Sequence, residues 1–302
     1  TFQSILRVPK LALILFSIAY GSTVGSVGTP SGGARNAILI EYLKNIPTPI
    51  SLSYSEWIIM AYPMVIIGMI ATSFMLKLTF KPEYNHLDTA VRKLKVNVAH
   101  RGKITGKELL SIFVFIFVFL AWILLNEEFG MGIIAIAGAF LYMATGLIEW
   151  KDVSKNTNWG VILLFAGAIS LGIQMKNTGA AQWIGSLIIG YSEDSITYFS
   201  IIPYVINILL TTILANIMSS SGTVAVISPV TLNMGGDPLF MGFTTAISSA
   251  FGYFSAIAAP ACMIIYSSGL VKVKDFLRAG WRMGIISILS LLYFFAFSSL
   301  LA

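Results

Sequence analysis

At positions 23–36 the chain reads Thr23-Val24-Gly25-Ser26-Val27-Gly28-Thr29-Pro30-Ser31-Gly32-Gly33-Ala34-Arg35-Asn36, and these small and polar residues interrupt an apolar sequence that runs over residues 11–22 and resumes at Ala37. A second apolar run, residues 240–254, breaks around Ala258-Ala259-Pro260-Ala261 and resumes through Ile264-Ile265-Tyr266. A dozen helical residues span about 18 Å, whereas a bilayer core needs roughly 20 residues, so each run is half a span. Irregular backbone survives at membrane depth only where protein or a wet cavity satisfies its N–H and C=O groups. Two such broken helices in one chain are typical of a transporter binding site.

The composition is that of a membrane protein. Hydrophobic residues make up 57% of the 302 residues, charged residues make up 11%, and the mean hydropathy is +0.84, which excludes the soluble globular class. We expect an all-α polytopic membrane protein without a separate soluble domain, because its unbroken apolar runs have the length of helical spans. These runs cover residues 57–76, 109–125, 131–148, 159–173 and 285–301. The single cysteine, Cys262, excludes an internal disulfide.

The net charge of +6 comes largely from two basic clusters that flank spans, which argues against nucleic acid as a partner. Between Lys77 and Lys107 there are eight basic and two acidic residues, and such clusters are typical of cytoplasmic loops of a protein in the plasma membrane. The second cluster consists of Lys272, Lys274, Arg278 and Arg282. Apolar residues in both clusters share one helical face, which predicts basic amphipathic helices that bind anionic lipid or, alternatively, a regulatory partner. These apolar residues are Leu87, Val91, Leu94 and Val98 in the first cluster, and Val273, Phe276, Leu277 and Gly280 in the second.

Residues 201–234 are apolar at both ends and small and polar in the middle, Ala215-Asn216-Ile217-Met218-Ser219-Ser220-Ser221-Gly222-Thr223. The arms are too short for two full spans, so we predict a re-entrant hairpin whose tip lies at mid-membrane. The chain would then start inside at Arg7 and Lys10, and the acidic residues Glu127, Glu128, Glu193 and Asp194 would lie outside. A single crossing at the hairpin would place the second basic cluster outside, against the charge rule.

Helix restarts at mid-membrane predict binding chemistry. Three restarts are expected, after Gly33, after Ser221 and at Pro260, and the free N–H groups and positive dipole end of each favour an anion. The predicted anion-binding residues are Gly33, Arg35, Asn36, Ser220, Ser221, Thr223, Ala259 and Pro260. The carbonyls of the preceding half-helices and nearby hydroxyls are oxygen ligands suited to sodium, although each serine could instead serve only helix packing. The predicted sodium ligands are Ser22, Ser26, Gly32, Ser219, Ser220 and Ala258.

Arg35 is the one charged residue expected close to mid-depth. A buried cation in a membrane is expensive, so it either pairs with an anionic ligand or bonds loop carbonyls and shapes the break. Carboxylates are expected only near helix ends, at Glu41, Glu56, Glu149 and Asp237. The absence of a carboxylate for a proton relay favours sodium coupling or anion exchange.

An enzyme and a channel are the competing classes. A serine nucleophile at Ser219–Gly222 would need a positioned base, but His86 and His100 both lie in the cytoplasmic loop, so we expect no enzyme. A channel or non-coupled pore shares re-entrant loops, but channels build filters by symmetry, whereas unlike half-sites in one chain favour alternating access.

The motifs resemble those of one transporter family. Residues 25–36 resemble the loop Gly-Gly-x-x-Thr-x-x-Gly-Thr-Pro-Pro-Asn of the divalent-anion:sodium symporters, the INDY-type dicarboxylate transporters of the ion transporter superfamily. Residues 159–168 resemble their Trp-Gly-x-x-Leu-Leu-Phe-Gly-Gly-Gly segment. Residues 219–225 lie where they carry Ser-Asn-Thr-Ala-Thr at the outer hairpin tip, and residues 258–269 resemble Ala-Thr-Pro-Pro-Asn-Ala-x-x-Tyr-Gly-Ser-Gly. The order of the motifs holds along nearly the whole chain.

The resemblance implies an inverted-repeat, elevator-type homodimer that moves a di- or tricarboxylate with sodium, with an anion exchanger of the same fold as the mechanistic rival. It implies that residues 1–54 form the first broken helix of the transport domain. Residues 55–158 would then form scaffold-type helices with the basic cytoplasmic segment, and residues 159–302 the outer hairpin, second broken helix and last span. The chain would correspond to the C-terminal two-thirds of the family fold, as a fragment of a longer protein or with its other half on a second polypeptide.

Several residues depart from the family pattern. Ser220 and Ser221 replace the hairpin Asn and Thr that contact sodium and a substrate carboxylate in the family. Ala259 and Cys262 replace Thr and Asn at the second break, and Gly33-Ala34-Arg35 replaces Thr-Pro-Pro at the first. The dicarboxylate specificity therefore depends on whether Arg35 restores the charge pairing.

Overall fold

The computed structural model describes residues 9–80, 95–96, 99, 104–157, 159–189 and 201–301 of the chain. Every regular element within these ranges is a helix, and three of the helices are long and apolar enough to cross a membrane: Tyr54–Thr79, Gly106–Ala144 and Val273–Tyr293. This confirms the predicted all-α class. The chain divides into two compact units, one made of Thr1–Leu52, Glu56–Lys81 and Gly160–Ala302, the other of Ser53–Ser55 and Pro82–Trp159. The three predicted domains remain a prediction.

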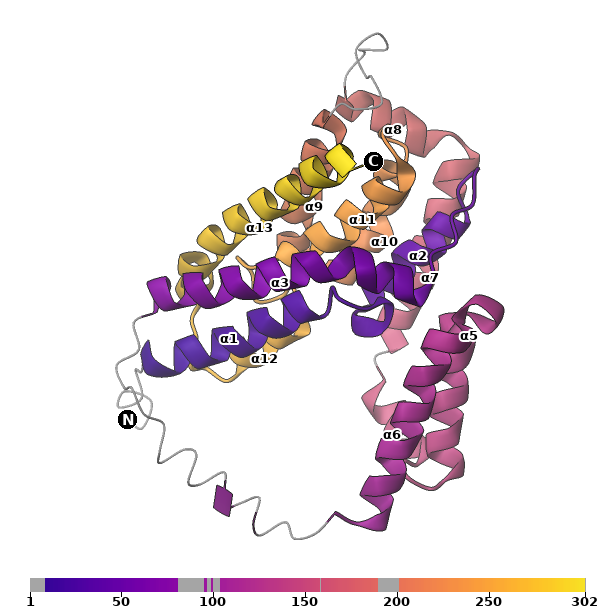
Figure 1. Cartoon of the computed structure of the whole chain (residues 1–302), viewed down its shortest axis with the longest axis vertical. Coiled ribbons are helices and arrows are strands. Elements are labelled where there is room, and N and C mark those ends of the chain that lie inside the picture. Colours follow the sequence, from indigo (N-terminus) through magenta and orange to yellow (C-terminus); the bar gives the residue numbers. More distant parts are fainter. Residues whose placement is uncertain are drawn as a thin grey trace. The chain divides into compact units, whose positions relative to one another are not determined.

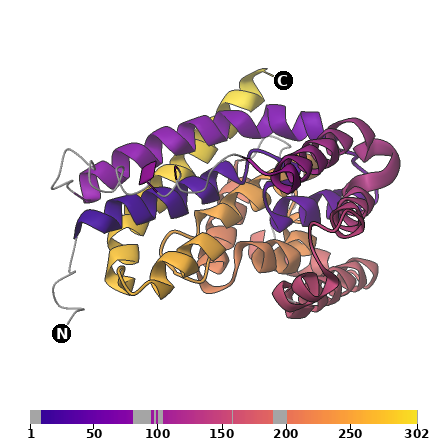
Figure 2. The ribbon, with the colours of Figure 1, turned by 90° about the horizontal axis from the view of Figure 1, so that it is seen from below.

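The first unit contains both predicted broken helices and the predicted hairpin (Figure 1). Its elements are α1 (Pro9–Gly25), η1 (Pro30–Gly32), α2 (Ala34–Lys44), α3 (Tyr54–Thr79, whose first two residues group with the other unit), α7 (Trp159–Asn177, whose first residue does the same), α8 (Ala180–Ile189), α9 (Ile202–Ile217), α10 (Ser220–Thr231), α11 (Pro238–Ser248), η2 (Ser249–Phe251), α12 (Pro260–Ser267) and α13 (Val273–Leu301). Helices α1 and α3 lie side by side in both ribbon views (Figures 1 and 2), and at Gly68 of α3 a Cβ atom would lie 2.8 Å from the side chain of Val24 in α1.

The second unit contains α5 (Gly106–Ala144) and α6 (Trp150–Asn156). Gly130 interrupts α5 with φ 75° and ψ 154°, a conformation that glycine adopts without the steric penalty of a side chain. The chain reverses at Gly130. One hydrogen bond shows this: the hydroxyl of Tyr142 donates to the carbonyl of Ser111 at 2.8 Å, although 31 positions separate these residues. A straight helix of that length would hold the two groups about 46 Å apart. The indole N–H of Trp122 likewise donates to the carbonyl of Met131 at 3.1 Å.

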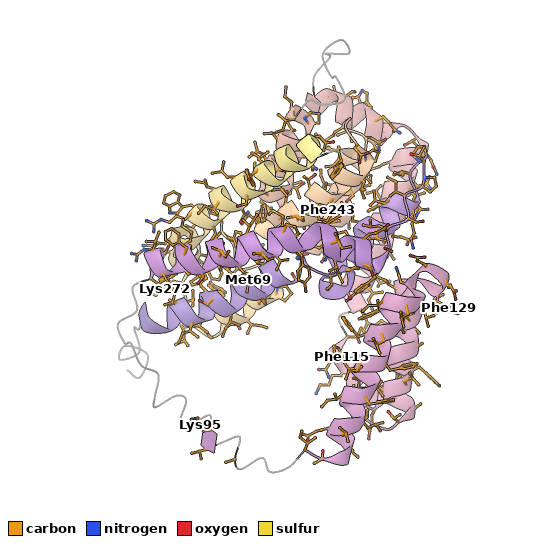
Figure 3. The ribbon with its side chains drawn as sticks, in the orientation of Figure 1. Met69, Lys95, Phe115, Phe129, Phe243 and Lys272 are labelled. Carbon is orange, nitrogen blue, oxygen red and sulfur yellow. The ribbon has the colours of Figure 1, made fainter. Side chains whose placement is uncertain are left out.

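Residues 109–125 and 131–148 were predicted to form two separate spans. The reversal confirms two antiparallel helical arms in this part of the chain. The second arm is shorter than predicted, because α5 ends at Ala144 and Gly146 adopts the left-handed φ of 68°. The surface of α5 carries exposed apolar side chains (Figure 3). The side chain of Phe115 is 60% exposed, and that of Phe129 is 52% exposed. Since water disfavours so much exposed aromatic surface, these arms fit a lipid environment.

The last helix differs from its prediction. The expected span 285–301 and the expected amphipathic segment around Val273 form one continuous helix, α13. Only part of the predicted apolar face packs inward, because Phe276 is fully buried whereas Val273 and Leu277 are both more than half exposed. The periodicity correctly predicted a helix, but the change from basic residues (Figure 3, Lys272 just before the helix) to apolar residues near 285 marks no helix boundary.

The C-terminal end of α3 meets the first turns of α13. The guanidinium of Arg282 donates to the hydroxyl of Thr79 at 3.3 Å, and the same guanidinium lies 5.3 Å from the ring centre of Trp281. Lys77 and the second basic cluster therefore lie at the same end of this unit. Most of the first basic cluster, its predicted helical face (Leu87, Val91, Leu94 and Val98), and Arg7, Glu193 and Asp194 lie outside the described residues.

A polar centre holds the hairpin to α11. The amide nitrogen of Asn207 in α9 lies 3.0 Å from the carbonyl of Met241, 2.9 Å from the hydroxyl of Thr244 and 3.0 Å from that of Thr245. The amide oxygen of Asn207 accepts from Thr211 and from Thr245. All four polar residues are fully buried. Hydrogen bonds of this kind join helices where lipid removes the usual hydrophobic drive for association.

Candidate functional site

The first break lies between α1 and α2 and is held by α3. Helix α1 ends at Gly25, and α2 begins at Ala34 with Gly33 as its N-cap, which confirms a restart directly after Gly33. The indole N–H of Trp57, which is fully buried in α3, donates to the carbonyl of Val27 at 2.9 Å. A Cβ atom on Gly32 would overlap the carbonyl oxygen of Ser26, so glycine is required for the loop to close on itself.

Arg35 folds back onto the end of α1. Its side chain is 5% exposed, and its Nη2 atom donates to the hydroxyl of Ser26 at 2.6 Å and to the carbonyl of Thr23 at 3.4 Å. Asn36 is fully buried, and its amide nitrogen donates to the carbonyls of Ser26 and Thr29 at 3.0 and 2.8 Å. Both side chains therefore bond the oxygen atoms that the half-helix and the loop expose.

The other sodium ligands predicted at the first break have local partners. The hydroxyl of Ser22 donates to the carbonyl of Ala19 at 2.9 Å, and that of Ser26 donates to the carbonyl of Thr23 at 2.7 Å. Ser22 and Gly32 are exposed residues, whereas Ser26 is half-buried. Of the three, only Ser26 contacts Arg35.

The hairpin tip lies between α9 and α10. Helix α10 begins at Ser220, so the restart comes earlier than the predicted position after Ser221. The reason is the N-cap: the exposed Ser219 accepts a hydrogen bond from the N–H of Gly222 at 3.2 Å, which satisfies one free donor of the first turn. Ser221 is half-buried, whereas Thr223, two residues farther along, is fully buried.

The second break meets the hairpin tip. Helix α11 ends at Ser248 and η2 at Phe251, and α12 begins with Pro260 at its first position, as predicted. The backbone N–H and the hydroxyl of Ser220 both donate to the carbonyl of Ala258, at 3.0 and 2.8 Å. Ala258 and Ala259 are buried, whereas Pro260 is exposed. The predicted sodium ligands Ser220 and Ala258 are thus in direct contact.

Asn216 makes a further link that sequence reasoning missed. Its amide oxygen accepts from the N–H of Phe254 at 2.9 Å, and its amide nitrogen donates to the carbonyl of Phe251 at 3.4 Å. The side chain thereby holds the last turn of α9 against the second break. The signal was an asparagine in the small and polar middle of residues 201–234, but the backbone groups of Phe251 and Phe254 lie far along the chain, and no spacing identifies them.

Tyrosine and tryptophan side chains join the first broken helix to the second. The hydroxyl of Tyr20 in α1 donates to the carbonyl of Tyr253 at 2.7 Å, and the two rings lie 4.8 Å apart. Trp57 packs edge-on against Phe243 of α11, at 5.3 Å between ring centres. Arg35 also lies within electrostatic range of Tyr253. The three breaks therefore share one region of the first unit.

Among the described residues, several buried polar atoms of this region have no hydrogen-bond partner, and these include Nε of Arg35, Oδ1 of Asn36, and the hydroxyls of Thr212 and Thr223. Buried polar groups are rarely left unpaired, so a ligand, ion or water is expected to meet them. Within the described ranges no cluster of His, Cys, Asp or Glu side chains could hold a metal. Glu41, Glu56, Glu149 and Asp237 are all exposed, as expected for residues near helix ends.

The chain resembles known transporters along almost its whole length. A family model for the sodium:sulfate symporter transmembrane region matches residues 7–301. An uncharacterized transporter of Haemophilus influenzae is 23% identical, with 91% of this chain and 60% of the relative aligned. The sodium-dependent high-affinity dicarboxylate transporter 3 of Caenorhabditis elegans is 25% identical over 91% of this chain and 54% of its own length. The sodium-dependent dicarboxylate transporter SdcS of Staphylococcus aureus is 24% identical over 95% and 58%.

The chain thus spans between 54% and 60% of the length of these relatives. The family match agrees with the motif resemblance at the two broken helices and the hairpin, and the apolar helices around them are those of an integral membrane protein. The chain belongs to the sodium:sulfate symporter family, the divalent-anion:sodium symporters.

Proposed function

We propose that this chain forms the substrate-binding part of a secondary transporter that moves a small anion, a di- or tricarboxylate, together with sodium. The observation that carries the proposal is the pair of hydrogen bonds from Ser220 to the carbonyl of Ala258, which joins the hairpin tip to the second break. The contact between the hairpin tip and the second break brings a restarting N-terminus and exposed carbonyls into one place, an arrangement typical of the substrate and ion sites of cotransporters. The names of the relatives support sodium and a dicarboxylate as the transported pair.

The anion would bind at the N-termini of α2, α10 and α12. The dipoles of these helices favour negative charge there, and no side chain caps α2 or α12. Arg35 adds a full positive charge with its Nε atom unpaired, and a guanidinium suits a carboxylate. The proposed anion-binding residues are Gly33, Arg35, Asn36, Ser220, Ser221, Thr223, Ala259 and Pro260.

Sodium would bind to oxygen atoms at the breaks. Ser220 and Ala258 already present a hydroxyl and a carbonyl to each other at 2.8 Å, and neutral oxygen ligands of this kind can replace the water around a small cation. Ser219 completes the proposed set at the hairpin. Ser22, Ser26 and Gly32 are the proposed set at the first break, where Arg35 competes for the same oxygen atoms.

The proposal includes the membrane arrangement. The contact between Arg282 and Thr79 supports a re-entrant hairpin, because it holds the basic ends of α3 and α13 together on what the charge rule makes the cytoplasmic side. We propose further that the protein is a homodimer in the plasma membrane and an inverted repeat. It would move its binding site by an elevator motion.

Uptake by proteoliposomes tests the proposal. The full-length protein is reconstituted, and uptake of radiolabelled carboxylates with two or three carboxyl groups is measured with and without an inward sodium gradient. We expect accumulation that requires sodium. Uptake that needs only an opposing gradient of unlabelled anion would identify an exchanger, and Arg35 is the observation that favours this second candidate, because it brings a cation of its own to the site. Dissipation of any anion gradient without saturation would identify a pore.

A further inference from the structure

Arg35 bonds the oxygen atoms that a cation at the first break would use. Helix α1 ends at Gly25, so the carbonyl of Thr23 lies in its last turn, where the dipole end is negative. This carbonyl accepts hydrogen bonds from the hydroxyl of Ser26 and from Nη2 of Arg35. The oxygen of the same hydroxyl accepts the short, 2.6 Å bond from Arg35. The guanidinium therefore has the oxygen partners, a hydroxyl and a half-helix carbonyl, that were predicted for sodium.

The position of the Arg35 guanidinium is electrostatically unfavourable. Arg35 is the second residue of α2, and the positive dipole end of α2 repels a positive charge. The side chain is also 5% exposed, and the hydrogen-bond acceptors that the described residues offer it, the hydroxyl of Ser26 and the carbonyl of Thr23, are neutral. The hydrogen bonds to the oxygen atoms of Ser26 and Thr23 offset the cost of burying this charge. A cation that replaces a bound ion would make the same contacts.

We infer that the guanidinium of Arg35 is a resident cation: it occupies the cation position of the first break, so that sodium binds only at the hairpin and second break. The inference rests on the proposed function and revises one half of the proposed sodium set: at the first break the guanidinium takes the place proposed there for sodium. Ser26 and Thr23 are then the acceptors of a fixed charge, and the transported sodium is coordinated around Ser220 and Ala258. The unpaired Nε atom leaves part of the same guanidinium for the anion.

Removing the fixed charge should create a sodium site. In Arg35→Gln the hydroxyl of Ser26 and the carbonyl of Thr23 lose their cation, and sodium can take its place. We measure the rise in Tm that sodium causes relative to choline. We expect this rise to be larger in the full-length purified variant than in the unchanged protein, because the variant has one more sodium site. At a sodium concentration ten times Kd, one added site corresponds to about 2–4 °C. The double variant Arg35→Gln/Ser26→Ala should lose this gain.

The comparison of the variants separates the two proposals. A gain in Arg35→Gln supports the resident cation whether or not the unchanged protein responds to sodium, whereas the response of the unchanged protein tests the proposed sodium coupling. An Arg35→Gln protein whose sodium response equals or falls below that of the unchanged protein would overturn the inference. So would a gain that persists in the double variant.

Ser26→Ala alone gives a test that does not depend on the folding of an arginine variant. We expect it to leave the half-saturating sodium concentration for uptake within about twofold, because Ser26 binds Arg35 and not sodium, while it weakens the anion affinity because Arg35 loses its acceptor. Ser17→Ala is the matched control: Ser17 lies on α1 outside the break, and its hydroxyl bonds the carbonyl of Leu13 four residues earlier in the same helix. A rise of tenfold in the sodium requirement of Ser26→Ala would overturn the inference.

Discussion

The two sides of the candidate site use different chemistry at the same kind of helix break. At the first break a buried arginine supplies the positive charge and bonds Ser26 and Thr23. At the hairpin and second break the contacts are neutral, a serine hydroxyl and N–H on the carbonyl of Ala258, and the amide of Asn216 on the backbone of Phe254. In the proposed mechanism, one side therefore holds a charge that cannot leave, whereas the other would offer oxygen atoms to an ion that can. Coupled transport needs the second kind of site, because only an exchangeable ion can carry the energy of a gradient.

The largest effect is expected from loss of the fixed charge. Arg35→Ala should weaken anion affinity by at least about 30-fold, since removing one partner of a buried charged contact costs about 2 kcal/mol or more. Arg35→Lys should weaken it less, because lysine keeps the charge but lacks the planar fork. The measurement is the half-saturating anion concentration for uptake by proteoliposomes.

The control is Lys44→Ala, an exposed cation at the other end of the same helix. It should leave the anion affinity unchanged. If Arg35→Ala transports with the affinity of the unchanged protein, Arg35 only shapes the break, and the difference drawn between the two breaks loses its functional meaning.

A smaller effect is expected at the neutral side. Ser220→Ala removes the hydroxyl that lies 2.8 Å from the carbonyl of Ala258 and should raise the half-saturating sodium concentration by up to about tenfold, the range of one neutral hydrogen bond. Ser220→Leu should raise it further, because its bulk fills a position that is 6% exposed. Ser267→Ala, an exposed serine that bonds its own helix α12, is the matched control. An unchanged sodium requirement in both Ser220 variants would remove this residue from the sodium site.

Accessibility of the hairpin tip tests whether the neutral side opens to the outside. Ser219 is exposed and lies at the tip, so Ser219→Cys in a Cys262→Ala background should react with a membrane-impermeant thiol reagent added outside. Bound anion and sodium should slow the reaction, because the proposed site lies directly beside Ser219. Labelling from the cytoplasmic side alone would show that the hairpin enters the membrane from the other face.

The positions of the breaks were predictable, whereas their contacts were not. Pro260 and the glycine-rich run at 28–33 interrupt helices for local steric and conformational reasons, and the structure places α12 and α2 directly after them. The start of α10 was predicted after Ser221, and this was wrong, because Ser219 caps the helix and α10 begins at Ser220. For Arg35, carbonyls at the break were one of the two predicted kinds of partner, and Arg35 bonds the carbonyl of Thr23 and the hydroxyl of Ser26. The partners of Asn216 and Tyr20 could not be predicted, because each bonds backbone groups whose positions depend on how several helices pack. Trp57 shows the same limit: its long helix was predicted as a plain span, yet its indole holds the first break.

The smallest effects concern the helix caps, which differ between the two breaks. Ser219 caps α10 by accepting from Gly222, whereas the N-cap of α2 is Gly33, which has no side chain to accept. Ser219→Ala should therefore weaken the first turn of α10 by about 1 kcal/mol and speed amide hydrogen exchange at Gly222 roughly fivefold.

Gly33→Ser should have the opposite consequence at the other break. The backbone of Gly33 is extended, with φ −164° and ψ 145°, so a side chain is tolerated there, and an added hydroxyl can cap the first turn of α2. A cap stabilises that turn by only a few tenths of a kcal/mol relative to glycine, yet it uses an N–H that the proposed anion also needs. We therefore expect slower amide exchange in α2 together with a twofold to fivefold loss of anion affinity, a range typical of one weak hydrogen bond. If Gly33→Ser slows exchange but leaves the anion affinity unchanged, the N-terminus of α2 does not bind the anion, and Arg35 must supply the attraction at the first break through its side chain alone.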